Sequence, residues 1–224
     1  MICDNIKIIL DKIEHVKNNA NRRDAVKLVV VTKTVSADKV KEAIGCGVTS
    51  IGENRVQEAE QKFSELSEFK NVEKHLIGHL QTNKAKKAVE LFDLIQSVDS
   101  IHLLTELDKR SQIIGKTQNC LVEIKVSEEE TKYGLNPNDL GNLLEKAKEF
   151  KNVRILGMMA IAPYFDDPEL SRPYFRKAYK YYSQYASDHS LSYLSMGMTH
   201  DFEIAIEEGS NMVRIGTAIF GART

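Results

Sequence analysis

The regular alternation of short apolar runs with longer amphipathic segments is the feature that most constrains the fold of this 224-residue chain. Short apolar or β-branched runs indicate strands, and parallel strands need long connections that are usually helical. The alternation continues along the whole sequence without a linker or a low-complexity tract. Eight runs predict strands, at residues 28–31, 50–52, 74–77, 94–98, 120–126, 154–159, 192–195 and 212–215.

The segments between these runs carry apolar residues three and four positions apart, which is typical of helices with one buried face. Ser36 and Asn138 are candidate N-caps for two of them. A similar segment, residues 2–19, precedes the first strand and places Ile6 and Ile9 on one face. The helices predicted between the strands and after the seventh are residues 37–45, 56–66, 83–92, 101–114, 139–150, 169–186 and 201–208.

Eight alternations in one chain predict a single α/β domain over residues 1–224, a (β/α)8 TIM barrel, with an open doubly wound sheet as the alternative. The two ends of the sequence favour the closed form. Only nine residues follow Ile215, too few for a full covering helix. The segment 2–19 would therefore fill the missing place over the junction of the last and first strands. An open sheet would not require it.

The charge balance argues against several classes of partner. The chain has 31 Lys and Arg against 32 Asp and Glu and a pI near 6.6, so no excess positive field attracts a nucleic acid or an anionic membrane surface. No apolar run approaches the roughly 20 residues needed to span a bilayer. Residues 1–7 lack the basic and then apolar order of a signal peptide. We predict a cytoplasmic protein that binds neither nucleic acid nor membrane.

The cysteines and histidines indicate neither a disulfide framework nor a metal site. Cys3, Cys46 and Cys120 are odd in number, far apart and without a C-x-x-C pair, which favours a reducing compartment. His75 and His79 form the one close histidine pair. On a strand, about 13 Å of rise separates residues four apart, and no third ligand is evident. We expect no metal.

In a barrel of this kind the chemistry lies at the carboxyl ends of the strands. Lys33 follows the first strand, and period-two alternation puts it on the same face as Val29 and Val31. A desolvated amine loses proton affinity and becomes a nucleophile toward a carbonyl, whereas the alternative is a lysine that extends to solvent. Arg214 shares a strand face with Met212 and is either half of a structural ion pair or part of a site.

Small residues and hydroxyls gather at the ends of the seventh and eighth strands, in residues 195–199 and at Gly216 and Thr217. Barrels frequently hold a phosphate group at these two strands. An amine that can form an imine, an arginine in the same mouth and a phosphate cradle match what pyridoxal 5′-phosphate requires. A sugar-phosphate aldolase would need nearly the same parts, so the residues by themselves leave both open.

Seven tracts of the sequence, in a fixed order, match the motifs of one known family. They are residues 31–34, 52–58, 75–84, 132–134, 157–159, 195–198 and 213–223. With these tracts the chain resembles the YggS/PROSC family of pyridoxal-phosphate-binding proteins over almost its whole length. The resemblance implies a single barrel like the N-terminal domain of alanine racemase. It also implies a cofactor, pyridoxal 5′-phosphate, joined as an internal aldimine to Lys33, with Arg214 facing the pyridine nitrogen and Asn54 near the ring.

The same resemblance implies which residues bind the cofactor's phosphate. Ser195, Gly216 and Thr217 match the family's phosphate ligands. Thr199 stands where relatives often carry serine, and since the hydroxyl is kept we expect the phosphate contact to be kept. Lys132 matches a second family lysine, in a loop, that would take part in handing the cofactor on.

The resemblance implies a carrier or regulator that keeps pyridoxal phosphate and amino-acid pools in balance, without sustained turnover. A cationic arginine at the ring nitrogen disfavours a protonated pyridinium and so weakens the ring as an electron sink. The alternative is a racemase-like enzyme that depends on the same cofactor, for which Tyr133, Tyr164 and His79 are the candidate acids and bases. We expect a monomer whose partners are the cofactor and the apo-enzymes that receive it.

Overall fold

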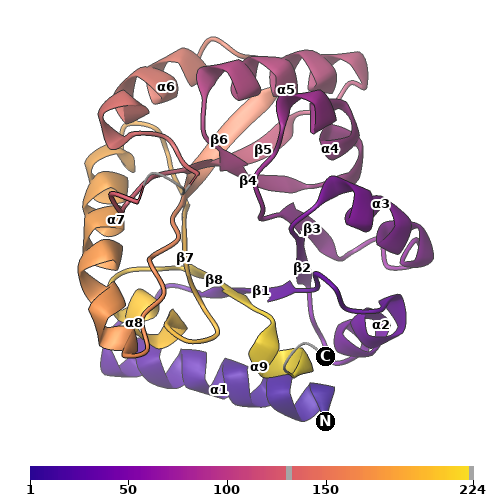
Figure 1. Cartoon of the computed structure of the whole chain (residues 1–224), viewed down its shortest axis with the longest axis vertical. Helices are drawn as coiled ribbons and strands as arrows, with labels where there is room; N and C mark the ends of the chain where they lie inside the picture. The colour runs from indigo at the N-terminus through magenta and orange to yellow at the C-terminus, as the bar shows by residue number, and fades with distance from the viewer. Residues whose placement is uncertain (130–132, 222–224) are drawn as a thin grey trace.

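Eight parallel strands close into a barrel, and helices surround it (Figure 1). The computed structural model describes residues 1–129 and 133–221. Each strand pairs with the next along the chain, and β8 pairs with β1, with Val30 opposite Ile215, which closes the ring. The predicted α/β (β/α)8 barrel is therefore confirmed. The strands are β1 (Lys27–Val31), β2 (Ser50–Glu53), β3 (Glu73–Leu76), β4 (Leu94–Val98), β5 (Gln118–Glu123), β6 (Val153–Met159), β7 (Tyr193–Met198) and β8 (Met212–Ile215).

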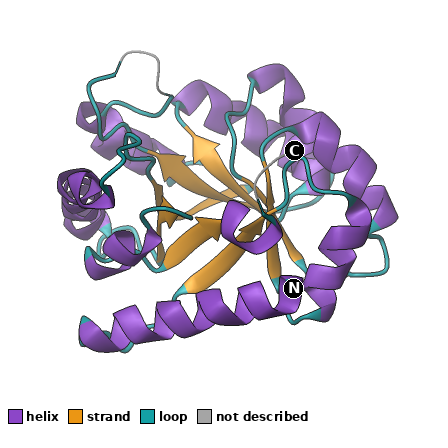
Figure 2. Cartoon of the chain, turned by 60° about the horizontal axis from the view of Figure 1, so that its bottom comes forward, coloured by secondary structure: helices purple, strands orange, loops and turns teal. Residues whose placement is uncertain are grey.

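The helices cover the outside of the strands (Figure 2). The first helix, α1, packs against α2, α8 and α9 and buries Ile6, Ile9 and Ile13, so its predicted covering role is confirmed (Figure 1). Among the residues that the structure describes, no helix is both long and apolar enough to span a bilayer. The helices are α1 (Ile2–Asn19), α2 (Ala37–Gly45), α3 (Val56–Glu65), α4 (Ala85–Leu91), α5 (Ile101–Ile113), α6 (Leu140–Ala147), α7 (Arg172–Tyr185), α8 (Phe202–Glu207) and α9 (Thr217–Phe220), with 3-10 turns η1 (Thr82–Lys84), η2 (Pro137–Asp139) and η3 (Pro168–Ser171).

The fifth strand is shorter at its carboxyl end than the sequence predicts. It ends at Glu123 rather than at Val126, because the chain then folds back on a later segment. The backbone N–H of Lys125 donates to the carbonyl of Leu135 at 3.0 Å, and the N–H of Leu135 donates to the carbonyl of Glu123 at 2.7 Å. An apolar run therefore extends beyond the regular strand, into the loop at the barrel mouth.

The two predicted N-caps do not act as caps. Asn138 lies inside η2, and the side chain of Asn136 caps that turn by accepting a hydrogen bond from the Asn138 N–H at 3.0 Å. Pro137 starts the turn, as proline favours the first helical position. Ser36 does occupy the N-cap position of α2, but its side chain makes no capping hydrogen bond.

Apolar side chains fill the space between the strands and the helices and also the lower part of the barrel interior. Two positions after interior apolar residues, the same strand faces carry Gln96 in β4 and Arg214 in β8. On these two strands the interior face thus changes from apolar to polar toward the carboxyl end, where the site lies. The interior apolar residues are Val29, Leu94, Leu121, Met159 and Met212.

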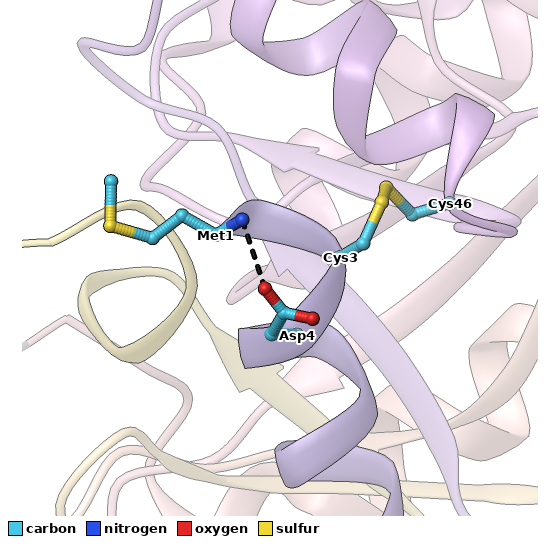
Figure 3. Close-up of a disulfide and its surroundings, with 4 residues drawn as sticks. All are labelled: Met1, Cys3, Asp4 and Cys46. Atoms are coloured by element: carbon cyan, nitrogen blue, oxygen red, sulfur yellow. Dashed lines mark ion pairs between the residues drawn. A yellow bond between two sulfur atoms is a disulfide. The ribbon is translucent and has the colours of Figure 1, made fainter.

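A disulfide joins Cys3 in α1 to Cys46, the residue that follows α2, with the two Cα atoms 5.3 Å apart (Figure 3). The expectation that the cysteines are unpaired is wrong for this pair, because sequence spacing does not reveal that α1 and α2 pack together. Cys120 is free and buried, and burial raises the pKa of its thiol to about 12. The inference of a reducing compartment rested on unpaired cysteines and loses that support.

Candidate cofactor site

A cavity of about 320 Å³ opens at the carboxyl ends of β1, β7 and β8. Its volume is at the lower end of the range of about 300–1,000 Å³ typical of small-molecule sites. Val31 lines the cavity and Val29 lies inside the barrel, so the strand face predicted for Lys33 is confirmed. The structure brings most of the predicted site residues to this cavity. Those that line it are Lys33, Thr199, Arg214, Gly216 and Thr217.

Lys33 leaves the sheet from a segment that is held on both sides. The hydroxyl of Thr32 donates to Glu53 Oε1 at 2.7 Å, and Lys62 Nζ donates to the carbonyl of Thr32 at 2.6 Å. Lys62 also pairs with Glu53 Oε1 at 2.5 Å, and the Glu53 side chain is fully buried. Thr34 has a φ of 63°, a left-handed conformation that is uncommon for threonine. This buried ion pair therefore fixes the point from which Lys33 enters the cavity.

Arg214 lines the cavity although only 3% of it is exposed. Its Nη1 donates to Ser195 Oγ at 2.6 Å, and its Nη2 donates to the carbonyl of Ala160 at 3.0 Å. Burial lowers the pKa of Arg214 to about 10, and the charges of Glu123 and Asp201 oppose that shift. The guanidinium stays cationic at pH 7. Among the described residues no carboxylate lies within ion-pair distance of it, so its direct partners are neutral.

Ser195 lies behind Arg214 rather than at the cavity surface. It is fully buried and stands apart from the described residues that line the cavity. Its hydroxyl accepts from Arg214 Nη1 and donates to Gln96 Oε1 at 2.7 Å. In this arrangement the hydroxyl serves the guanidinium, and the predicted phosphate contact of Ser195 stays a prediction.

The loops after β7 and β8 carry the other groups expected to hold a phosphate. Thr199 and Thr217, which both carry a hydroxyl, line the cavity, and Gly216 precedes the short helix α9. A Cβ on Gly216 would lie 3.0 Å from a carbonyl oxygen of β1, so the glycine lets this loop approach that strand closely. Asp201 Oδ1 accepts from the backbone N–H of Met198 at 2.7 Å and holds the other loop in place. Hydroxyl and N–H donors are suited to an anion.

Asn54 follows β2 and is half-buried, outside the group of cavity-lining residues in the described chain. Gly78 fixes its position, because a Cβ at Gly78 would lie only 2.4 Å from the carbonyl oxygen of Asn54. The loop after β3 therefore packs directly on the loop after β2. The predicted place of Asn54 near a bound ring stays a prediction.

Gln96 and Glu123 are the candidates that the sequence interpretation missed. Gln96 is fully buried, and Glu123 is 6% exposed and lines a second cavity of about 240 Å³. Burial raises the pKa of Glu123 to about 7, and the charge of Arg214 opposes this shift. Each follows an inward-facing leucine by two positions, and that periodicity was the signal available in the sequence.

The three acid and base candidates do not share one cavity. Tyr164 lines the cavity that Lys33 lines, whereas Tyr133 lines the second cavity. His79 stacks on Tyr133 with ring centroids 3.8 Å apart, and its Nδ1 lies 3.4 Å from Asp99 Oδ2. The hypothesis of a two-sided acid and base arrangement therefore has one candidate in the first cavity.

The two histidines singled out in the sequence have separate surroundings. His75 is buried inside the barrel with its Nδ1 2.8 Å from Gln96 Nε2, whereas His79 lies at the barrel mouth. Within residues 1–129 and 133–221, no group of three His, Cys, Asp or Glu side chains could hold a metal ion. Lys132, the second family lysine, lies outside the described residues.

Comparisons with known proteins agree over the full length of the chain. A family model described as the N-terminal domain of alanine racemase matches residues 5–224. The pyridoxal phosphate homeostasis protein of Aquifex aeolicus (strain VF5) is 42% identical over 224 residues, 99% of this chain and 98% of that protein. Two structures of PipY from Synechococcus elongatus PCC7942 are also similar, and each comparison covers 99% of this chain and 100% of the PipY chain. The structure without PLP has a TM-score of 0.90 at 33% identity, and the structure with PLP bound has a TM-score of 0.86 at 32% identity.

Proposed function

The chain belongs to the alanine racemase N-terminal domain family and, within it, to the pyridoxal phosphate homeostasis (YggS/PROSC) proteins, and from this premise we propose that it binds pyridoxal 5′-phosphate and balances its supply without sustained turnover. The observation that carries the proposal is the meeting of Lys33, Arg214 and three candidate phosphate ligands at one cavity. The structure of PipY with PLP bound, similar over the whole chain, supports it.

The groups that line the cavity fit this cofactor in kind and number. When bound, the cofactor supplies an aldehyde carbon that reacts reversibly with a primary amine. Lys33 offers that amine, and Arg214 offers a donor for the ring nitrogen. Thr199, Gly216 and Thr217 offer hydroxyl and backbone donors for the phosphate. Lys33 would thus hold the cofactor covalently, and the other four would orient it.

Arg214 determines which chemistry the site favours. A guanidinium only donates hydrogen bonds, and with a pKa of about 10 it keeps its proton at neutral pH. A fixed cation facing the ring nitrogen opposes protonation of that nitrogen. This weakens the electron withdrawal that amino-acid chemistry on this cofactor requires. The residue therefore supports binding rather than turnover.

The positions of the acid and base candidates also support binding rather than turnover. Racemisation needs proton-transferring groups on both faces of the reacting carbon. Tyr164 lines the cavity with Lys33, but His79 and Tyr133 stack beside the second cavity. This separation supports a carrier over the racemase-like alternative.

The central test is the loss of covalent binding on removal of one amine. Wild-type protein loaded with the cofactor should absorb visible light, and borohydride reduction followed by peptide mass spectrometry should find a pyridoxyl group on Lys33. Lys33→Ala should lose both signals. Lys125→Ala, which removes a lysine of the second cavity, should keep both and is the matched control. A pyridoxyl group elsewhere with Lys33 unmodified would contradict the proposal.

Two other outcomes would assign a different function. Sustained racemisation, decarboxylation or transamination by the wild-type protein would favour the enzyme. A colourless protein that borohydride traps only in the presence of a sugar-phosphate ketone or aldehyde would favour the aldolase.

Delivery to apo-enzymes is the cellular part of the proposal. An apo-enzyme should regain activity when mixed with the loaded protein, and adding a scavenger of free cofactor separates direct transfer from release and rebinding. The monomeric state and the cytoplasmic location remain predictions from the sequence. Sedimentation equilibrium should return a mass near 25.3 kDa if the protein is a monomer.

A further inference from the structure

A network of polar side chains crosses the barrel interior behind Arg214. Arg214 Nη1 lies 2.6 Å from Ser195 Oγ, and Ser195 Oγ lies 2.7 Å from Gln96 Oε1. Gln96 Nε2 lies 2.8 Å from His75 Nδ1, and His75 Nε2 lies 3.2 Å from Glu73 Oε2. These residues come from β8, β7, β4 and β3 and are at most 3% exposed except Glu73, which is half-buried. We call these five residues the interior network.

The hydrogen bonds of the interior network have a fixed direction. Arg214 can only donate, so Ser195 must accept from it and must point its own proton at Gln96 Oε1. The Gln96 amide nitrogen then faces His75 Nδ1, which accepts. The other His75 nitrogen, Nε2, lies 3.2 Å from Glu73 Oε2 without making a hydrogen bond, so this last contact of the network is electrostatic. From Arg214 to His75, each hydrogen bond therefore fixes the orientation of the next.

Further contacts hold the network at Glu73, its end, and at Gln96, its middle. Glu73 is paired with Lys27 and accepts from Ser50 Oγ at 3.3 Å, and these contacts anchor it at the amino end of the barrel. Contact with His75 holds the pKa of Glu73 at about 2, so the carboxylate stays ionised. Gln96 Nε2 also donates to Met212 Sδ at 3.3 Å. Both amide hydrogens of Gln96 are thus used, and this keeps its side chain in one orientation.

The anchored amide controls what Ser195 can do for Arg214. If the Ser195 hydroxyl could donate to a different acceptor, it would rotate about its C–O bond. Its oxygen lone pairs would then no longer point at the guanidinium in one fixed direction. A hydroxyl that donates to Gln96 is also a stronger acceptor for Arg214, because hydrogen bonds in series polarise one another. The interior network therefore holds Arg214 with a neutral partner and leaves its positive charge directed at the cavity.

We propose that Gln96, oriented by His75, is a positioning residue for the cofactor site: through Ser195 it sets the direction of the Arg214 guanidinium at the ring-binding end of the cavity. The inference rests on the proposed function. It assigns Ser195 to Arg214 in the protein interior and leaves the phosphate to Thr199, Gly216 and Thr217. Gln96 acts through other side chains and lies away from the described lining of the cavity.

The test replaces Gln96 by a side chain of nearly the same length that makes none of its hydrogen bonds. Gln96→Met should release the cofactor about tenfold faster than wild type and shift its visible absorption maximum, since the donor facing the ring nitrogen is displaced. In the cofactor-free protein, the NMR signals of the Arg214 guanidinium should also move or broaden. Ser195→Ala, a smaller change, should act in the same direction.

A matched control separates positioning from general damage to the barrel. Gln118, at the start of β5, is also fully buried, and its Nε2 donates to the carbonyls of Asn119 at 2.9 Å and Asp93 at 3.2 Å. Gln118→Met should lower the melting temperature but leave the absorption maximum and the release rate at wild-type values.

Three further outcomes decide the inference. In the double variant Gln96→Met with Ser195→Ala, the effect on release should match the larger single effect, because both residues act through one contact. If Gln96→Met and Ser195→Ala match wild type in spectrum, release rate and Arg214 signals, the inference is overturned and the proposed function stands. If wild type binds no cofactor, the proposed function fails and the inference fails with it.

Discussion

Two buried cations lie beside the candidate site, and the protein neutralises them in different ways. Lys62 contacts the carboxylate of Glu53 directly at 2.5 Å and also donates to the carbonyl of Thr32. Arg214 contacts a hydroxyl and a carbonyl, while the charges of Glu123 and Asp201 act on it from a greater distance. The positive charge of Lys62 is thus satisfied inside the protein, whereas that of Arg214 remains available to the cavity.

We interpret this difference as that between a structural cation and a cation of the proposed cofactor site. Breaking a buried ion pair destabilises the protein, because removal of one partner leaves the other charged and unpaired. A buried charge held by neutral groups costs stability in the free protein and becomes favourable when an anion or an acceptor binds beside it. The sequence left two interpretations of Arg214 open, and its neutral partners favour the site over the structural ion pair.

The largest expected effect comes from breaking the structural pair. Lys62→Met leaves the Glu53 carboxylate buried without its cation and should lower the free energy of unfolding by about 3–5 kcal/mol. Urea unfolding measures it. The double variant Lys62→Met with Glu53→Gln removes both charges and should recover most of the loss. If Lys62→Met is as stable as wild type, the pair does not hold the segment that carries Lys33.

The disulfide lies outside the site, and its contribution to the free energy of unfolding can be compared with that of the Lys62 ion pair. Cys3 and Cys46 are 43 residues apart, and a cross-link over such a loop stabilises by at most about 4 kcal/mol in the chain-entropy view. Reduction, or Cys3→Ser, should lower the free energy of unfolding toward that amount without changing cofactor affinity. Thiol titration of the unreduced, denatured protein should find one thiol, that of Cys120; three thiols would contradict the cross-link.

Glu123 allows a measurement of how much stability is lost when a carboxylate is buried near Arg214 without contacting the guanidinium. Below pH 4.5 the carboxyl is protonated in both states; between pH 4.5 and about 7 the unfolded chain loses the proton while the folded protein keeps it. Stability from this group therefore falls as pH rises through that window, by about 3 kcal/mol in total. Glu123→Gln should match wild type at pH 4 and exceed it by about that amount at pH 8, measured by urea unfolding. A constant difference across pH would contradict the raised pKa.

The fold could be predicted from the sequence because its signals are local and repeated. Each strand is a short apolar run, and each helix shows its own spacing, so the order of elements and the covering role of residues 2–19 followed directly. The disulfide between Cys3 and Cys46 could not be predicted, because it depends on α1 and α2 packing side by side. The wrong cap at Asn138 has a similar cause, since the choice between Asn136 and Asn138 depends on where the turn begins.

The site was predictable where strand alternation carries the information. Lys33 and Arg214 were identified by face and strand end, and both line the cavity. Gln96 and Glu123 carry the same period-two signal, but their strands are apolar on both faces, so the sequence does not show which of the two faces is the interior one. The sequence also did not show that the Ser195 hydroxyl bonds Gln96 of β4 and Arg214 of β8, because Gln96 lies 99 residues away along the chain; its predicted phosphate contact stays a prediction.

The smallest stability effect is expected at Arg214, and it is the sharpest test of the contrast with Lys62. Arg214→Met removes a buried charge that no described carboxylate contacts, so the free energy of unfolding should change by less than about 1 kcal/mol or should rise. Cofactor affinity should fall at least about tenfold, because the donor for the ring nitrogen is lost. Urea unfolding and a titration followed by visible absorption measure the two effects.

Arg22→Met is the matched control for Arg214→Met. Arg22 pairs with Asp24 and donates to carbonyls away from the cavity, so this variant should lose stability and keep cofactor affinity. If Arg214→Met instead loses as much stability as Lys62→Met, the two cations have the same structural role and the distinction between them fails.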